Sequence, residues 1–196
     1  MCGRFVMQID KKILDEIMDK VQKKVTDQAT LMSLKMEGEI FPTNVVPIKT
    51  ADGYAPMKWG FEMSGRSVIN ARSETALEKP MFRTAMLERR CLIVASGYYE
   101  WKSEPTGPKS KYEFSVPGQS LMYLAGCYRT EKDLAVPAFV ILTRDAIPAF
   151  EAIHNRMPVV LDQADADEWL QGSDVDLTGL MTHSLTKLSY TPVVQS

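Results

Sequence analysis

The residues with the most chemical potential lie far apart in the sequence, at Cys2, Glu100 and His154. Removal of an initiator methionine before a residue as small as cysteine leaves a free α-amine and a thiol on Cys2. The amine titrates near roughly 7.7–8.0 and the thiol near about 8.5, so a useful fraction of each is reactive at neutral pH. The amine can condense with an aldehyde to an imine, and the thiol can then close a thiazolidine ring. A cysteine at position 2 is weak support by itself.

Glu100 stands among aromatic residues in the segment 97–101, whose composition is typical of a β-strand. Period-two alternation places Glu100 on one face with Tyr98, and Tyr99 with Trp101 on the other. A carboxyl group on a buried face has a raised pKa and can hold a proton near neutrality. The more common alternative is an edge-strand glutamate that faces water.

Three other polar residues each allow a structural and a chemical interpretation. His154 lies in a loop before a strand, where a side chain that titrates near pH 6.5 can shuttle protons, although a structural histidine is more common. Asn70 precedes a helix entry at which Ser73 is the expected N-cap, so Asn70 is either a site residue or part of that turn. Asn44 is either a turn former or a polar site group, and the turn is the default.

The elements that must position these residues follow from periodicity and turn signals. Apolar residues recur on one stripe of residues 10–24, which predicts an amphipathic helix with Asp10 as its N-cap. The other expected elements, in chain order, are an extended segment over 41–47, two short strands within 55–70 around Trp59-Gly60, a helical segment over 74–86 broken near Pro80, strands over 91–95, 98–101, 111–116, 121–128, 138–142 and 159–161, a helix led by Asp162 through Trp169, and a strand near 190–194. These elements predict an α+β fold with a curled, mainly antiparallel β-sheet or barrel-like core and a few peripheral helices.

Composition narrows the class of protein. A chain of 196 residues is the size of one domain, spanning 1–196, and 45% hydrophobic with 24% charged residues is a globular composition. No apolar run has the length of a signal peptide or a membrane span, so we expect a cytoplasmic protein. Three cysteines without a Cys-x-x-Cys pair and two histidines predict no disulfide framework, metal or cofactor. A net charge of −2 means that any site for a polyanion must be local.

Six blocks of the sequence, in order, are similar to the SRAP (SOS response-associated peptidase) family, and they span almost the whole chain. They are Cys2-Gly3-Arg4, Asn44-Val45-Val46-Pro47, Trp59-Gly60, Asn70-Ala71-Arg72-Ser73-Glu74-Thr75, Gly97-Tyr98-Tyr99-Glu100-Trp101 and Ile153-His154-Asn155-Arg156-Met157-Pro158. The resemblance implies a sensor and shield of abasic sites in single-stranded DNA that crosslinks through its N-terminal cysteine, with replication-fork proteins as candidate partners. It also implies an autopeptidase that exposes this cysteine.

The resemblance assigns roles to nine residues. It implies that Cys2 is the nucleophile, that Asn70 holds its amine and the sugar, that protonated Glu100 donates to the sugar ring oxygen, and that His154 moves protons. The implied DNA contacts are Arg4, Arg72 and Arg156 to phosphates, with Asn44 and Thr143 as further candidates for the DNA channel. No metal ligand is implied.

Two other classes of function stay open. A cysteine peptidase would use Cys2 as thiolate and His154 as base, and would need no DNA. A non-covalent single-strand binder would need stacking aromatics and local positive charge, for which a pI near 5.8 is unhelpful.

Overall fold

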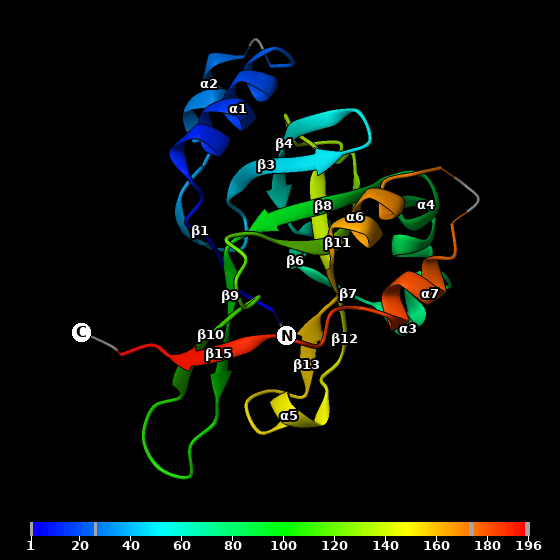
Figure 1. The fold of residues 1–196 in the computed structure, drawn as a ribbon. Helices are drawn as coiled ribbons and strands as arrows, with labels where there is room; N and C mark the ends of the chain where they lie inside the picture. Colours follow the sequence, from blue (N-terminus) through cyan, green and yellow to red (C-terminus); the bar gives the residue numbers. More distant parts are fainter. Residues whose placement is uncertain (1, 26, 173–174, 195–196) are drawn as a thin grey trace.

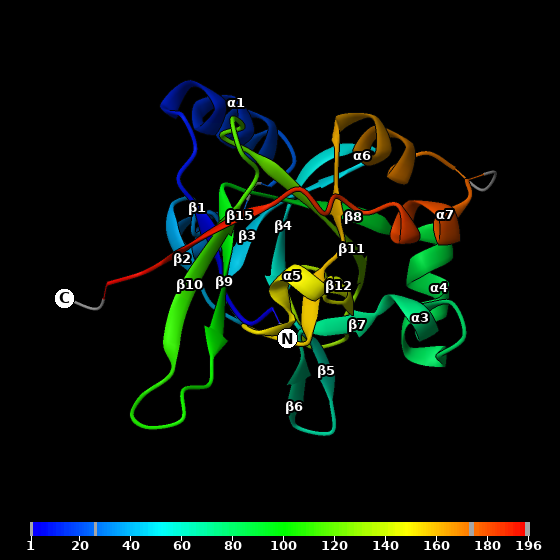
Figure 2. The same ribbon diagram turned by 60° about the horizontal axis from the view of Figure 1, so that its bottom comes forward.

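The computed structural model describes residues 2–25, 27–172 and 175–194 (Figures 1 and 2). Met1, whose removal we expect from the sequence, lies outside the described residues. The fold is α+β, as the sequence predicts, with strands at the centre and helices at the periphery (Figure 1).

Five strands pair in a closed circuit at the centre of the molecule. In order around the circuit they are β12 (Ala138–Asp145), β4 (Gly53–Trp59), β3 (Val45–Thr50), β8 (Arg90–Ala95) and β11 (Met122–Arg129), and β11 returns to pair with β12. This closure removes the sheet edges, as in a small barrel. Three short strands extend the circuit, with β7 (Asn70–Arg72) and β13 (Arg156–Pro158) on β12 and β14 (Val160–Leu161) on β11.

A second sheet is antiparallel throughout its described pairs. Its order is β15 (Ser189–Pro192), β10 (Ser110–Ser115), β9 (Gly97–Lys102), β1 (Phe5–Met7) and β2 (Gly38–Ile40). A Cβ added at Gly97 would lie 2.7 Å from the backbone oxygen of Phe114, so the close approach of β9 and β10 requires glycine there. The start of the chain leads into β1 and lies near β13 and β7 in both views (Figures 1 and 2).

The helices cover the outside of these sheets. They are α1 (Lys11–Gln22), α2 (Gln28–Ser33), α3 (Ser73–Ala76), α4 (Pro80–Glu88), α5 (Pro148–Glu151), α6 (Gln163–Trp169) and α7 (Leu177–Thr182). Asp10 and Asp162 cap α1 and α6 with their side chains, which confirms the predicted N-cap Asp10 and the predicted helix led by Asp162. The break at Pro80 is also confirmed, because Pro80 begins α4 as a residue that needs no amide donor.

Two local predictions were wrong. Ser73 is the first residue of α3 rather than its N-cap, and the capping position is held by Arg72 without a side-chain hydrogen bond. The segment 55–70 holds parts of four strands rather than two, because a hairpin of β5 (Phe61–Met63) and β6 (Arg66–Val68) follows β4 and precedes β7. Gly60 makes this turn possible, since its φ of +118° is a conformation that side chains disfavour.

Trp59 links the barrel to the second sheet. Its ring is buried, lies 5.1 Å from the ring of Phe5 and stacks on Phe139 at 6.2 Å between centroids. Its indole nitrogen donates to the carbonyl oxygen of Ile69, next to Asn70. The core therefore fixes β1 and β7 relative to each other. Within the described residues, no helix combines the length and the apolar character needed to cross a membrane.

Candidate active site around Cys2

Strand register brings Cys2 to Glu100. Strand β1 pairs antiparallel with β9 at Phe5 and Tyr98, and the amide of Tyr99 donates to the carbonyl oxygen of Arg4 at 2.9 Å. Continuing this register toward the start of the chain carries Cys2 past Glu100. The Cys2 side chain is fully buried, and this burial, followed by the nearby Glu100 carboxylate, raises the pKa of its thiol.

Asn70 ties the start of the chain to the barrel. Strand β7 runs parallel to β12 with Asn70 opposite Ile141, and the Asn70 side-chain amide donates to the carbonyl oxygen of Cys2 at 3.0 Å. The side-chain oxygen of Asn70 is buried and accepts no hydrogen bond from any described residue. A buried acceptor without a donor is costly, so this oxygen is suited to an amine or a bound ligand.

Glu100 is buried rather than facing water, because β9 lies between β1 and β10 and is not an edge strand. The relative exposure of Glu100 is 3%. The alternative interpretation, an edge-strand glutamate that faces water, is therefore wrong. Burial raises the pKa of Glu100 to about 7, and the Trp101 amide and Lys109 offset part of this rise. The carboxyl group can therefore hold or release a proton near neutral pH.

His154 faces Glu100 through one ring nitrogen and its own loop through the other. Nδ1 lies 3.0 Å from the amide nitrogen of Arg156 and 3.2 Å from its carbonyl oxygen, so the loop can satisfy Nδ1 as acceptor or as donor. Nε2 lies 4.0 Å from Oε2 of Glu100, an ion-pair distance. Burial lowers the pKa of His154, which favours the neutral imidazole. Both neutral tautomers find a partner, and this suits a residue that exchanges protons.

The surroundings of Cys2 favour the protonated thiol over the thiolate. Its sulfur lies 3.9 Å from the carbonyl oxygen of Arg4, to which the S–H donates. Burial, followed by the charge of Glu100, raises the pKa of the Cys2 thiol well above its ordinary value. Peptidase thiolates instead have lowered pKa values. This environment disfavours an attack that begins at sulfur.

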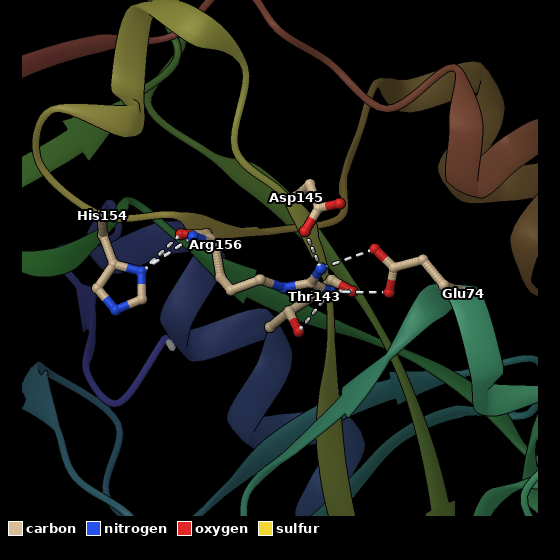
Figure 3. Close-up of polar contacts among 5 residues, drawn as sticks. All are labelled: Glu74, Thr143, Asp145, His154 and Arg156. Carbon is tan, nitrogen blue, oxygen red and sulfur yellow. Dashed lines mark hydrogen bonds and ion pairs between the residues drawn. The ribbon is translucent and has the colours of Figure 1, made fainter.

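Arg156 is a buried side chain that links β13, β12 and α3 (Figure 3). Its guanidinium donates to both carboxylate oxygens of Glu74 at 2.7 and 2.9 Å, to Asp145 at 2.5 Å and to the carbonyl oxygen of Thr143 at 2.7 Å. The Arg156 side chain is 7% exposed, and the Thr143 residue is buried at 1%. This geometry favours a structural role for Arg156, in which it holds the His154 loop in place. It does not favour the phosphate contact that the sequence led us to expect.

The remaining predicted DNA contacts differ in availability. Arg72 is exposed, and its guanidinium makes no hydrogen bond or ion pair with another described residue. Arg4 pairs with Glu39 at 2.8 Å and stacks on Phe41 at 3.8 Å from the ring centroid. Asn44 accepts a hydrogen bond from the Phe41 amide at 2.9 Å, so it forms the turn that was the default interpretation.

Sequence reasoning missed a group of cations and aromatics beside Arg4. Lys111 shares Glu39 with Arg4 at 2.7 Å and lies 3.8 Å from the centroid of Tyr99. Trp101 lies opposite Lys111 in the β9–β10 register, and Phe41 is exposed nearby. Alternation within the strand predicted that Tyr99 and Trp101 share a face. Lys111 joins them because β10 pairs with β9 in a register that local sequence patterns do not encode.

Comparisons with known proteins establish the family of this chain. The chain matches the family described as SOS response associated peptidase (SRAP) over residues 1–196, and it belongs to that family. It is 31% identical to the abasic site processing protein YoqW of Bacillus subtilis (strain 168), over 90% of this chain and 83% of that protein. It is 28% identical to the abasic site processing protein HMCES of Rattus norvegicus, over 70% of this chain and 51% of that protein.

A solved structure shows the same fold. A crystal structure of a protein from Bacteroides thetaiotaomicron matches with a TM-score of 0.79 and 23% identity, over 98% of this chain and 92% of that one. Among the described residues, no group of three or more histidine, cysteine, aspartate or glutamate side chains is arranged to hold a metal ion.

Proposed function

We propose that this protein captures abasic sites in single-stranded DNA through a covalent bond to Cys2, and so shields them during the response to DNA damage. The observation that carries the proposal is the convergence of Cys2, Asn70 and Glu100 at the start of the chain. Asn70 holds the Cys2 carbonyl at 3.0 Å, and the pKa of Glu100 near 7 keeps a proton available. The names of its relatives, abasic site processing proteins, support an abasic site as the substrate.

The first step is opening of the abasic sugar, which exists mostly as a cyclic hemiacetal. Protonated Glu100 donates to the ring oxygen as the bond from that oxygen to C1′ breaks, and the anomeric hydroxyl gives up its proton as the aldehyde forms. His154 can take that proton on Nε2 when its Nδ1–H donates to the Arg156 carbonyl. Nε2 lies 4.0 Å from Oε2 of Glu100, so one bridging water or a small movement of the His154 ring would return the proton to the carboxylate.

The second step joins protein and DNA. The α-amine of Cys2, freed by removal of Met1, attacks the aldehyde carbon, and loss of water gives an imine. The Cys2 sulfur then bonds to the imine carbon and its proton passes to the nitrogen, which closes a thiazolidine. A thiol with a raised pKa fits this order, because sulfur acts only after the amine has made an electrophilic partner.

DNA binding in this proposal rests on surfaces on either side of Cys2. Arg72 is an exposed cation on β7, and Arg4 with Lys111, Phe41 and Trp101 forms a cationic and aromatic surface suited to phosphates and stacked bases. We propose that Asn44 supports this surface through the Phe41 turn.

A denaturing gel tests the proposal. Mature protein is incubated with a single-stranded oligonucleotide that carries one abasic site, or with the same strand carrying tetrahydrofuran, which cannot open to an aldehyde. A shifted band that survives heat is expected with the abasic strand and not with tetrahydrofuran. Equal bands with both strands, or none with either, would contradict covalent capture of the aldehyde.

A further inference from the structure

A hollow of about 450 Å³ lies beside Asn70 and is not used by the chemistry proposed above. It is lined on one side by Met63 and Val68 of the β5–β6 hairpin, and on the other by Met81 and Phe82 of α4. Strand β7 runs between these two walls, and Figure 2 shows it between the hairpin and α3. A volume in this range is typical of sites for small organic groups, which span roughly 300–1,000 Å³.

The walls are apolar and polarisable. Two of the four wall residues are methionines, whose thioethers make favourable contacts with aromatic rings. Met63 is 45% exposed although its side chain is large and apolar, so part of this lining residue is open to solvent. Such walls suit a flat, unsaturated ring.

The rim carries two available cations. Arg72 and Lys79 line the hollow, and neither side chain makes a hydrogen bond or ion pair with another described residue. By contrast, the buried Arg156 is already paired with Glu74 and Asp145. Positive charge beside an apolar hollow complements a group in which a flat ring is joined to an anion, such as a nucleotide.

The hollow shares Asn70 with the candidate active site. Asn70 lines it and also donates to the Cys2 carbonyl at 3.0 Å, and Thr143 lines it and lies against Arg156. The hollow is therefore within one residue of the place at which an abasic sugar would be held by Cys2.

We infer that the hollow between the β5–β6 hairpin and α4 holds the base of the nucleotide next to the abasic site, with its phosphate at Arg72 and Lys79. This inference rests on the proposed function, because it takes single-stranded DNA as the ligand. It assigns Met63 and Met81 the contact with the base and makes binding depend on a base on one side of the lesion.

The test measures the contribution of that base to affinity. Single-stranded oligonucleotides carry tetrahydrofuran in place of the abasic site, so that no crosslink forms, and a second tetrahydrofuran replaces either the 5′ or the 3′ neighbouring nucleotide. Fluorescence anisotropy should show binding about tenfold weaker without the base on one side and little change on the other. Equal effects on both sides, or no effect, would overturn the inference.

Variants assign the effect to the hollow. Met63→Ala and Met81→Ala should each reduce the ratio of the two affinities to near one, while Met32→Ala, on the exposed surface of α2 at 80% exposure, should keep the wild-type ratio. A loss of affinity that is equal for strands with and without the base indicates a structural role and overturns the inference. Thermal melting confirms that the variants fold.

The outcome is separable from that of the proposed function. Crosslinking of wild-type protein to a true abasic site with baseless neighbours measures covalent capture without any base in the hollow. A crosslink on this strand together with an affinity ratio of one would retain covalent capture and reject the base site. An affinity ratio near ten without any crosslink would retain the base site and reject covalent capture.

Discussion

The side-chain amide of Asn70 donates to the carbonyl oxygen of Cys2 across 68 positions of sequence, at 3.0 Å. This bond joins the start of the chain to a strand of the closed barrel, and it fixes the direction in which the Cys2 amine and thiol leave the backbone. The neighbouring Asn70 oxygen is left buried without a described donor. Asn70 therefore has both a positioning bond and an acceptor available for the amine or sugar.

Asn70→Asp should separate positioning from stability. The carboxylate cannot donate to the Cys2 carbonyl, and its charge would favour a protonated, unreactive amine. We expect crosslinking to an abasic strand to slow at least about tenfold while the melting temperature changes little, since one hydrogen bond contributes about 0.5–1.5 kcal/mol. Single-turnover rates on denaturing gels measure this, with Asn44→Asp as a matched control on the Phe41 turn. Equal slowing by both variants would argue against a special role for Asn70.

Glu100→Gln should change how the stability of the protein responds to pH. The folded-state pKa of Glu100 is raised from 4.5 to about 7, so the unfolded chain loses its proton first as pH rises. The carboxyl group therefore lowers the free energy of unfolding progressively between about pH 4.5 and 7, by about 1.4 kcal/mol for each pH unit. Urea unfolding of wild type against Glu100→Gln should show the variant gaining relative stability across this window. A pH-independent difference would contradict the raised pKa.

The same variant should lose catalytic acid chemistry. Crosslinking by wild-type protein should fall as pH rises through about 7, because Glu100 loses the proton that it donates to the sugar ring oxygen. Glu100→Gln should crosslink slowly at all pH values, with DNA affinity nearly intact because the amide keeps the shape. An equal loss of affinity would indicate a structural role instead.

Substitution of Arg72 should weaken DNA binding, whereas substitution of Arg156 should destabilise the fold. Arg72→Ala removes an exposed cation and should lower the slope of log affinity against log salt by roughly 0.7, with little effect on unfolding. Arg156→Ala leaves Glu74 and Asp145 without their shared cation and should destabilise by roughly 2–3 kcal/mol, less than for a fully buried pair because both carboxylates reach water. Salt titrations of affinity and urea unfolding measure the two effects. The reverse pattern would place Arg156 on DNA and Arg72 in the scaffold.

Local chemistry made much of the fold predictable. The caps Asp10 and Asp162, the break at Pro80 and the alternation around Glu100 are signals that act within a few residues. The parallel pairing of β12 with β7 and the bonds from Arg156 to Glu74 join positions far apart, and no local pattern encodes them.

The candidate site divides in the same way. Sequence motifs named Cys2, Asn70, Glu100 and His154, and the structure brings these four together. The paired state of Arg156 and the cluster of Lys111 with Trp101 depend on strand register, so residue type alone could not assign their roles.

The central claim is that amine and thiol act together on the same terminal residue, and intact-mass measurement of the crosslink tests it most directly. Mature protein beginning at Cys2 should gain the mass of the abasic strand less one water and keep it through heat and denaturant. Cys2→Ser, which keeps the amine without the ring-closing sulfur, should show a lasting adduct mainly after borohydride reduction. Protein that retains Met1 has no free Cys2 amine and should give no heat-stable adduct. A heat-stable adduct of the Met1-retaining form, as fast as that of mature protein and with Met1 still present by mass, would contradict the account.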